Sequence, residues 1–270
     1  MTVRPPRTAL TIAGSDSGGG AGIQADLKTF AALGVYGTSA IAAITAQNTI
    51  GVTAAESVGT DLVIAQIEAV AGDIELHATK TGMLATAALV EAVAATIKAL
   101  ELPLVVVDPV IVAKSGDRLL DEDAVQAMRA ELLPVSYVVT PNIPEAEVLS
   151  GRSIASLNDA RDAAQRIHAL GPGAVIVKGG HGVGAEIVDL LFDGERFVEF
   201  RTPRLRTRNT HGTGCTFASA IAAHLAVGFA LAEAAERAQA YVAGAIRHGL
   251  AIGHGHGPLD HFWTGSIPRS

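Results

Sequence analysis

Three short, largely apolar runs, at 104–107, 137–140 and 174–177, limit most strongly what this chain can fold into. Segments with apolar residues at helical spacing separate them, at about 121–133 and 158–170. Apolar strands that alternate with amphipathic helices are typical of a parallel sheet covered by helices on both faces. We therefore predict an α/β protein with a mostly parallel central sheet.

The rest of the pattern extends this sheet within one domain, residues 1–270, because a chain of 270 residues without a break in composition suits a single large core. We predict a first strand at 8–13, a pair of strands at 39–45 and 52–58 that forms a small flap, and a hairpin around the Asp193-Gly194 turn. The predicted helices are 23–33, a helix from residue 60, 86–100, 121–133, 158–170 and 231–247.

Polar residues follow each of the three apolar runs. Asp108 comes directly after the first, Asn142 and Glu145 follow the second, and Lys178 follows the third. Ligands of open parallel sheets bind beyond the carboxyl ends of the strands, so we expect these side chains at one edge of the sheet. Each could be a turn, helix-start or surface residue when taken alone. Their recurrence at successive strand ends favours a shared site.

The stretch 209–216 contains the chain's one cysteine and leads into apolar residues at helical spacing. It predicts a glycine-rich loop that opens a buried helix. The first N–H groups of a helix lack partners and carry a partial positive charge, so those of Gly212, Thr213, Gly214 and Cys215 can stabilise an anion. An ordinary glycine-rich turn with a core cysteine is the alternative interpretation.

These groups together suit phosphoryl transfer. The carboxylates of Asp108 and Glu145 can hold Mg²⁺, directly or through water, and Lys178 can offset the charge of phosphates. Other nucleotide signatures are weaker. Residues 20–25 match the dinucleotide pattern G-x-G-x-x-A, but the acidic residue that would bind the ribose does not follow, and no P-loop sequence is present.

Six segments, in order, resemble the hydroxymethylpyrimidine/phosphomethylpyrimidine kinases of thiamine biosynthesis. They are 9–30, 46–49, 80–84, 108–110, 140–147 and 212–215, and the resemblance covers about residues 9–262. It implies a ribokinase-like fold and two successive ATP-dependent phosphorylations. The first acceptor would be 4-amino-5-hydroxymethyl-2-methylpyrimidine, and the second would be its monophosphate.

The resemblance also implies roles for individual residues. Gln47 would recognise the aminopyrimidine edge, for which a carboxamide offers both a donor and an acceptor. The remaining pocket residues would be Gly14, Asp26, Met83 and Val110. The nucleotide would contact Asn142, Lys178, Thr213 and Gly214. The catalytic groups would be Cys215, Lys178, Gly212 and Gly214, with Cys215 at the position where many sugar kinases of this fold have an aspartate base.

Cys215 allows two interpretations. A helix N-terminus lowers the pKa of a thiol, so we expect some thiolate that could take the proton of the hydroxymethyl group. The alternative is that a small residue is needed for close packing within residues 212–215, here named the anion-binding loop.

Two other functions remain open. A pyridoxal or pyridoxine kinase also phosphorylates a hydroxymethyl group on a six-membered nitrogen ring, and a non-catalytic pyrimidine sensor would keep the pocket alone. The net charge of −7 argues against nucleic-acid binding, and no apolar run is long enough to predict a membrane span. A single cysteine and no signal-peptide pattern predict a cytoplasmic protein. The predicted flap at 39–58 is a surface that a second copy could cover in a homodimer.

Overall fold

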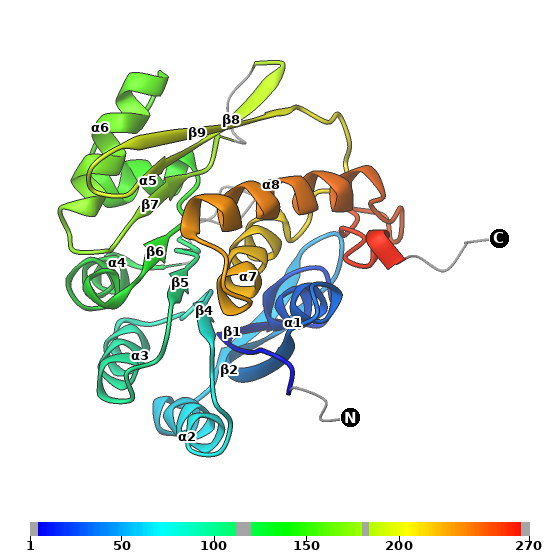
Figure 1. Cartoon of the computed structure of the whole chain (residues 1–270). Helices are drawn as coiled ribbons and strands as arrows, with labels where there is room; N and C mark the ends of the chain where they lie inside the picture. The colour runs from blue at the N-terminus through cyan, green and yellow to red at the C-terminus, as the bar shows by residue number, and fades with distance from the viewer. Residues whose placement is uncertain (1–4, 112–119, 180–183, 266–270) are drawn as a thin grey trace.

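The computed structural model describes residues 5–111, 120–179 and 184–265. One sheet of nine strands runs through the molecule in the order β3-β2-β1-β4-β5-β6-β7-β8-β9 (Figure 1). Neighbours from β2 to β7 pair in parallel, whereas β3, β8 and β9 pair antiparallel. The strands are β1 (Thr8–Asp16), β2 (Tyr36–Gln47), β3 (Val52–Ser57), β4 (Ala78–Thr81), β5 (Val105–Val107), β6 (Val138–Val139), β7 (Val175–Val177), β8 (Glu186–Phe192) and β9 (Phe197–Pro203).

Helices cover both faces of the sheet. The α-helices are α1 (Gly22–Ala32), α2 (Thr60–Ala71), α3 (Ala87–Ala99), α4 (Glu122–Ala127), α5 (Ile143–Ser150), α6 (Leu157–His168), α7 (Thr213–Ala226) and α8 (Leu231–Arg247). A π-helical turn (Met128–Leu132) and a 3-10 turn (Leu133–Val135) continue α4, and a 3-10 turn (Trp263–Gly265) follows later. Helices α2 to α6 lie on one face, and α1, α7 and α8 lie on the other (Figure 1).

The apolar runs are continuous because both of their faces are buried. In β5, Val105 and Val107 pack into the core on the α2–α6 side, and Val106 packs into the core on the α7–α8 side. Val138 and Val139 of β6 divide between the two cores in the same way. Helix α7 is almost wholly buried, which explains its apolar sequence without a polar face.

The predicted α/β class, the mostly parallel sheet and the flap are confirmed. Two elements were not predicted. Strand β4 has a lysine and two threonines among its four residues, and α5 is only eight residues long with a proline in its first turn. The segment 121–133 was predicted as one helix, but it is α4 followed by the π-helical turn. None of the helices in the described ranges is both long and apolar enough to cross a membrane.

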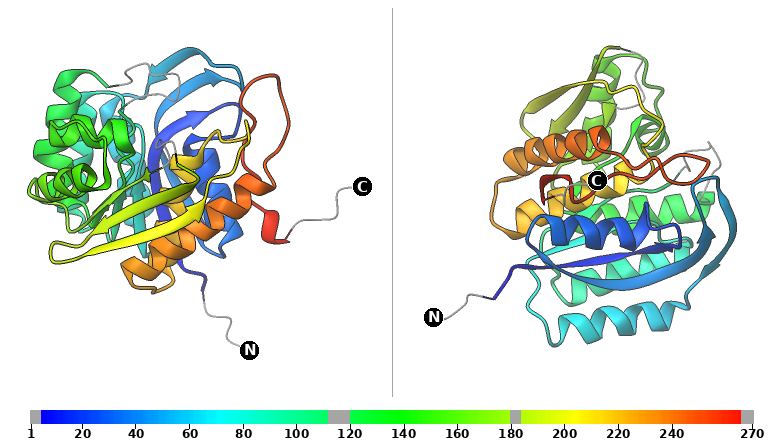
Figure 2. Two further views of the ribbon diagram at one scale, coloured as in Figure 1. Left: turned by 90° about the horizontal axis from the view of Figure 1, so that it is seen from above. Right: turned by 90° about the vertical axis from the view of Figure 1, so that its right-hand side faces the viewer.

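The flap made by β2 and β3 extends from one end of the sheet. Every residue of β3 is exposed, and Val52 and Ile44 expose more than half of their surface. The C-terminal segment around Gly255 lies beside the tip of the flap (Figure 2), where the Gly255 N–H donates to Thr49 Oγ1 and the His256 N–H donates to the Thr49 carbonyl.

Candidate active site

Asp108 and Lys178 meet at the carboxyl ends of β5 and β7, as predicted. Lys178 Nζ lies 2.9 Å from Asp108 Oδ1, and the side chains are only 14% and 3% exposed. Backbone bonds hold both residues at the strand ends, because the Asp108 N–H donates to the Thr81 carbonyl and the Lys178 N–H to the Pro141 carbonyl. Burial alone would lower the pKa of Lys178, but the carboxylates of Asp108 and Glu145 raise it above its ordinary value, so the ammonium stays charged.

The N-terminus of α7 lies directly against this pair. A Cβ on Gly214 would stand 3.4 Å from Lys178 Nζ and 3.6 Å from Asp108 Oδ2. Gly212 is the N-cap with φ +81°, and a Cβ there would overlap the Gly20 carbonyl oxygen, so the position requires glycine. Thr213 N–H turns back toward the Thr210 carbonyl at 3.4 Å, and Thr213 Oγ1 donates to the same oxygen. The Thr213 amide is therefore less available to an anion than the Gly214 and Cys215 amides that follow it.

Glu145 approaches the same site from the first turn of α5. Its Oε2 accepts from the Asn142 N–H at 2.8 Å, while Asn142 Oδ1 accepts from the Glu145 N–H at 2.9 Å. This capping box fixes both side chains. Burial raises the pKa of Glu145 to about 7; Lys178 opposes the rise, and the nearby Asp108 carboxylate adds to it.

These residues fit a Mg²⁺ ion that keeps part of its water shell. Asp108 and Glu145 are two buried carboxylates, and both interact with one ammonium, that of Lys178. A bound cation would therefore balance the remaining negative charge. No group of three or more histidine, cysteine, aspartate or glutamate residues that could hold a metal occurs in the described part of the chain. Mg²⁺ commonly takes one or two carboxylates together with waters and phosphate oxygens, so a larger cage is not required.

The raised pKa of Glu145 predicts that the affinity of the site for Mg²⁺ depends on pH. If the Glu145 carboxylate binds Mg²⁺, its pKa of about 7 predicts that the apparent affinity for Mg²⁺ rises as the pH increases from about 6 to 8 and levels off above that. Calorimetric titration of Mg²⁺ in the presence of a non-hydrolysable ATP analogue measures this. Glu145→Gln should weaken the affinity and flatten its pH profile, whereas Glu91→Gln on exposed α3 surface should do neither. A steep profile retained in Glu145→Gln would assign the titration to another group.

The Cys215 thiol does not behave as expected from its place in α7. Burial raises the pKa of Cys215 to about 12; Lys80 opposes the rise, and the carboxylates of Asp108 and Asp26 add to it. The expectation of a lowered pKa is wrong, because loss of hydration outweighs the effect of the helix N-terminus. The thiol is protonated at neutral pH.

Of the residues expected in the pyrimidine pocket, Asp26 lies in the protein interior, unlike Met83 and Val110. Gly14 and Met83 adjoin, since a Cβ on Gly14 would lie 2.7 Å from Met83 Cε. Val110 is partly buried in the turn after Asp108. Asp26, in contrast, lies wholly in the interior, where Oδ2 accepts from Lys80 Nζ at 2.8 Å and from Thr11, and Oδ1 accepts from Ser219. Its carboxylate oxygens are thus already used within the core.

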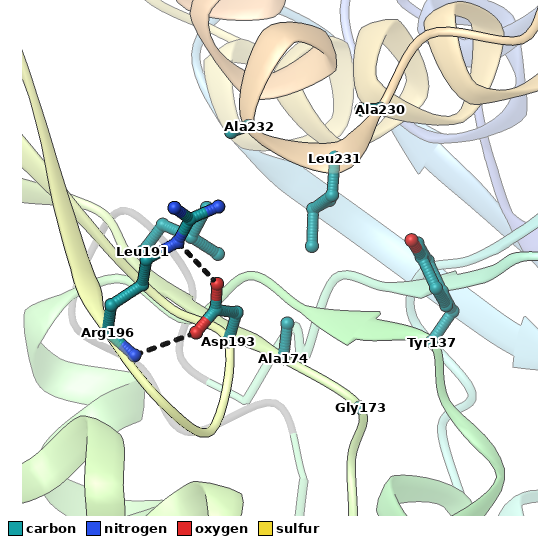
Figure 3. A pocket seen from close by; sticks show the side chains of 9 residues that line it. All are labelled: Tyr137, Gly173, Ala174, Leu191, Asp193, Arg196, Ala230, Leu231 and Ala232. Carbon is teal, nitrogen blue, oxygen red and sulfur yellow. Dashed lines mark hydrogen bonds and ion pairs between the residues drawn. The ribbon is translucent and has the colours of Figure 1, made fainter.

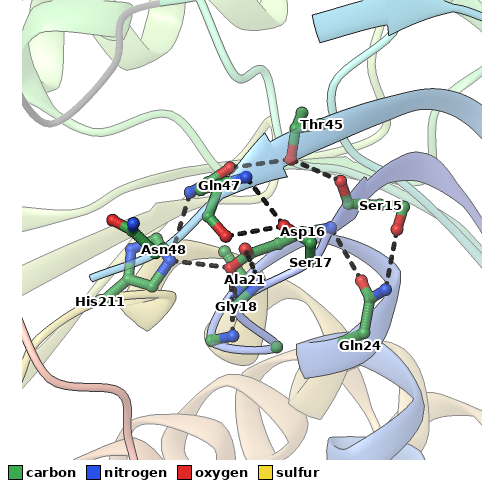
Figure 4. Close-up of polar contacts among 12 residues, drawn as sticks. Ser15, Asp16, Ser17, Gly18, Ala21, Gln24, Thr45, Gln47, Asn48 and His211 are labelled. Carbon is green, nitrogen blue, oxygen red and sulfur yellow. Dashed lines mark hydrogen bonds and ion pairs between the residues drawn. The ribbon is translucent and has the colours of Figure 1, made fainter. Parts of the chain in front are cut away.

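Gln47 lies at the end of β2 in a polar network that the sequence did not predict (Figure 4). Its backbone is tied to Ser17, whose hydroxyl donates to the Gln47 carbonyl and accepts from the Gln47 N–H. Its side chain lies near His211, the residue before Gly212, and His211 Nε2 in turn lies 2.9 Å from Asp16 Oδ2. No pattern identifies this link beforehand, because His211 and Asp16 are 195 residues apart in the sequence.

A separate pocket of about 300 Å³ lies at the opposite end of the strands, where Tyr137 precedes β6 and Ala174 precedes β7 (Figure 3). Leu231 and the Asp193–Arg196 ion pair also line it. It contains none of the predicted site residues. The groups suited to phosphoryl transfer are therefore at the carboxyl ends of the strands, away from this pocket.

Comparison with known proteins gives the family. The family model described as "Phosphomethylpyrimidine kinase" matches residues 16–260. The hydroxymethylpyrimidine/phosphomethylpyrimidine kinase of Rhizobium meliloti is 53% identical over 259 residues, which are 94% of this chain and 96% of that protein. The thiamine biosynthesis bifunctional protein ThiED of Geobacter sulfurreducens is 51% identical over 95% of this chain, and the chain spans about half, 52%, of its length.

Solved structures agree in fold. A Bacillus subtilis pyridoxal kinase in complex with ADP superposes with a TM-score of 0.89 at 40% identity, over 95% of this chain and 98% of that one. The predicted ribokinase-like fold is confirmed by this neighbour. Family model, relatives and fold agree over nearly the whole chain, and the chain therefore belongs to the phosphomethylpyrimidine kinase family.

Proposed function

We propose that the chain transfers the γ-phosphoryl group of ATP first to the hydroxymethyl group of 4-amino-5-hydroxymethyl-2-methylpyrimidine and then to the resulting monophosphate. One observation carries the proposal: the Asp108–Lys178 pair lies against the N-terminus of α7 at Gly214. A cation, two carboxylates and free helix amides at one place are the groups that phosphoryl transfer needs.

The chain's residues would divide the work in the following way. Asp108 and Glu145 would hold Mg²⁺, which would neutralise part of the negative charge of the ATP phosphates. Lys178 offsets the charge of the transferred group, and the Gly214 and Cys215 amides stabilise its oxygens. Asn142 and Thr213 would contact the nucleotide. In the first step the acceptor oxygen forms a bond to phosphorus, the bond to ADP breaks, and the hydroxyl proton leaves with a phosphate oxygen or water, since the Cys215 thiol is already protonated.

The direct test supplies the purified protein with ATP, Mg²⁺ and the hydroxymethylpyrimidine, and follows the monophosphate and diphosphate by chromatography. We expect both products in sequence. Pyridoxal is the competing acceptor, because the Bacillus subtilis neighbour is a pyridoxal kinase, and it should be assayed in parallel. Preferential phosphorylation of pyridoxal would replace the proposed substrate while keeping the reaction type. Binding of the pyrimidine without product formation would instead favour a sensor.

Cys215→Ala separates the two interpretations of the cysteine. Because the thiol is protonated, we expect the substitution to lower kcat of both phosphorylations by the same factor, about tenfold, through lost packing beside the Gly214 amide. Separate assays with the alcohol and with the monophosphate measure the two factors. A loss confined to the first step would show that Cys215 takes the hydroxyl proton, because the phosphate acceptor of the second step is already ionised.

We also propose that the enzyme works in the cytoplasm as a homodimer in which a second copy covers the flap. The edge strand β3 is exposed throughout, and Ile44 and Val52 expose more than half of their surface. An exposed edge of this kind is open to pairing with another chain. Light scattering in solution should give twice the chain mass of 27.6 kDa. Ile44→Lys should reduce that value to the mass of one chain.

A further inference from the structure

The two ends of the Gln47 amide face different partners. One end lies 3.2 Å from Thr45 Oγ1, and the other lies 3.4 Å from His211 Nε2 (Figure 4). The oxygen and the nitrogen of an amide are nearly equal in size, so only their hydrogen-bond partners decide which end is which. The donors and acceptors around Gln47 therefore determine what it presents to a ligand.

His211 is a donor in this network. Its Nε2 lies 2.9 Å from Asp16 Oδ2, and Asp16 is only 3% exposed and also accepts from the Gly20 and Ala21 N–H groups. Burial alone would raise the pKa of Asp16, but the hydrogen bonds from His211 and from the Ala21 and Gly18 N–H groups hold it below its ordinary value, so the carboxylate is ionised and can only accept. Nε2 must therefore carry its one hydrogen, which it donates to Asp16. A protonated ring nitrogen has no lone pair to accept from an amide N–H, so the end of the Gln47 amide nearest to it must be the oxygen.

Thr45 leads to the same orientation independently. Its hydroxyl has one hydrogen, which is donated to the Ser15 carbonyl at 2.8 Å. Thr45 Oγ1 can therefore only accept a further hydrogen bond, so the end of the Gln47 amide that faces it must be the nitrogen. Figure 4 draws the nitrogen toward His211. Rotating the Gln47 amide by half a turn exchanges its oxygen and nitrogen without moving either atomic position. Each hydrogen-bond donor around it then has an acceptor.

The fixed amide leaves one oxygen lone pair and one N–H at its free edge, in a set order. A 4-aminopyrimidine pairs with this edge by placing its amine against Oε1 and its ring nitrogen against the N–H. On that ring the hydroxymethyl group is the neighbour of the amine, so it lies on the His211 side. The next residue is Gly212, where the anion-binding loop begins. The opposite amide order would turn the ring over and direct the hydroxymethyl group toward Thr45, away from that loop.

We propose that His211, held by Asp16, is a positioning residue that fixes the orientation of the Gln47 amide and thereby points the hydroxymethyl group of the pyrimidine toward the anion-binding loop. The inference rests on the proposed function, since it takes Gln47 as the residue that recognises the ring.

The test uses a substrate with the reverse order of donor and acceptor. The 4-oxo analogue of the pyrimidine carries an oxygen acceptor and a ring N–H donor where the natural ring has an amine and a nitrogen acceptor. We measure kcat/KM for phosphorylation of both hydroxymethyl compounds. His211→Leu removes the donor, and the ratio of kcat/KM for the amino ring to that for the oxo ring should fall by about tenfold. His211→Gln restores an N–H donor and should restore most of the ratio.

His256→Leu is the matched control. His256 is exposed, and its side chain lies against the Arg208 carbonyl rather than against Gln47. The same change of residue type there should leave the ratio unaltered. A fall in the ratio in His256→Leu as large as in His211→Leu would overturn the assignment.

The remaining outcomes are distinct. If the wild-type protein phosphorylates neither ring, the proposed function itself fails. If it phosphorylates the amino ring, and His211→Leu loses activity on both rings by the same factor, then His211 supports the loop without orienting Gln47, and the inference is overturned. Should His211→Leu not fold, Thr45→Val removes the partner at the other end of the amide, with Thr45→Ser as its control. An unchanged ratio in Thr45→Val would then overturn the inference.

Discussion

Lys80→Met is expected to lower the free energy of unfolding by about 3–5 kcal/mol, because it leaves the carboxylate of Asp26 buried without its counter-charge. Both side chains are 0% exposed, and Nζ lies 2.8 Å from Asp26 Oδ2. Burial would lower the pKa of Lys80, but Asp26 raises it above its ordinary value, so the native pair is ionic. Urea denaturation with an unchanged m-value measures the loss.

Two further variants control this prediction. Lys98→Met removes an exposed lysine from α3 and should change stability by about 0.5 kcal/mol or less. The double variant Asp26→Asn/Lys80→Met removes both charges and should recover most of the lost stability, since the penalty comes from the unpaired carboxylate. A loss below about 1 kcal/mol in Lys80→Met alone would mean that water or another group neutralises Asp26.

Gly212→Ala is expected to lower kcat by about 10²-fold, because it displaces the amides that face the transferred phosphoryl group. Gly212 has φ +81°, and a Cβ there would overlap the Gly20 carbonyl oxygen. The backbone around Gly212 or around Gly20 must therefore move to accommodate alanine. Steady-state kinetics give the loss, and thermal denaturation shows whether the protein stays folded.

Gly228 provides the matched control. It has φ +98° at the other end of α7, but no heavy atom lies within 4 Å of its Cβ position. Gly228→Ala should therefore lower the free energy of unfolding by about 1 kcal/mol, because alanine must adopt the left-handed backbone conformation there, and it should leave kcat unchanged. Equal kinetic effects in the two variants would trace the loss to general destabilisation rather than to the loop.

The strand-end residues were predictable because one rule determines their position. Parallel strands deliver their carboxyl ends to one edge, and Asp108 and Lys178 meet there at 2.9 Å although 70 residues separate them. The capping box of Asn142 and Glu145 is also present in the sequence, but the α5 that it begins has only eight residues, too few for a clear apolar period. Local signals were sufficient for the long, periodic helices and the apolar strands, but not for the short elements β4 and α5.

Contacts between distant residues could not be predicted where no rule of the fold places both partners. A lysine inside a strand is costly unless a carboxylate meets it, and nothing near Lys80 in the sequence indicates Asp26, 54 residues earlier. The pKa of Cys215 likewise depends on how far other elements cover the start of α7 and on the charges of Lys80, Asp108 and Asp26. The partners of His211 and Gln47 are decided by loops that only the folded chain brings together.

The hydrogen bond from Ser219 to Asp26 spans 193 residues, and the one between His211 and Asp16 spans 195. A growing chain at the ribosome that has reached residue 200 already holds Asp108, Glu145 and Lys178, yet it lacks the helix and the histidine that complete the site. Closure of such distant contacts is slow and comes late in folding. Nascent chains of that length should therefore not transfer phosphate from ATP, and synthesis of the last 70 of the 270 residues decides when the enzyme becomes active.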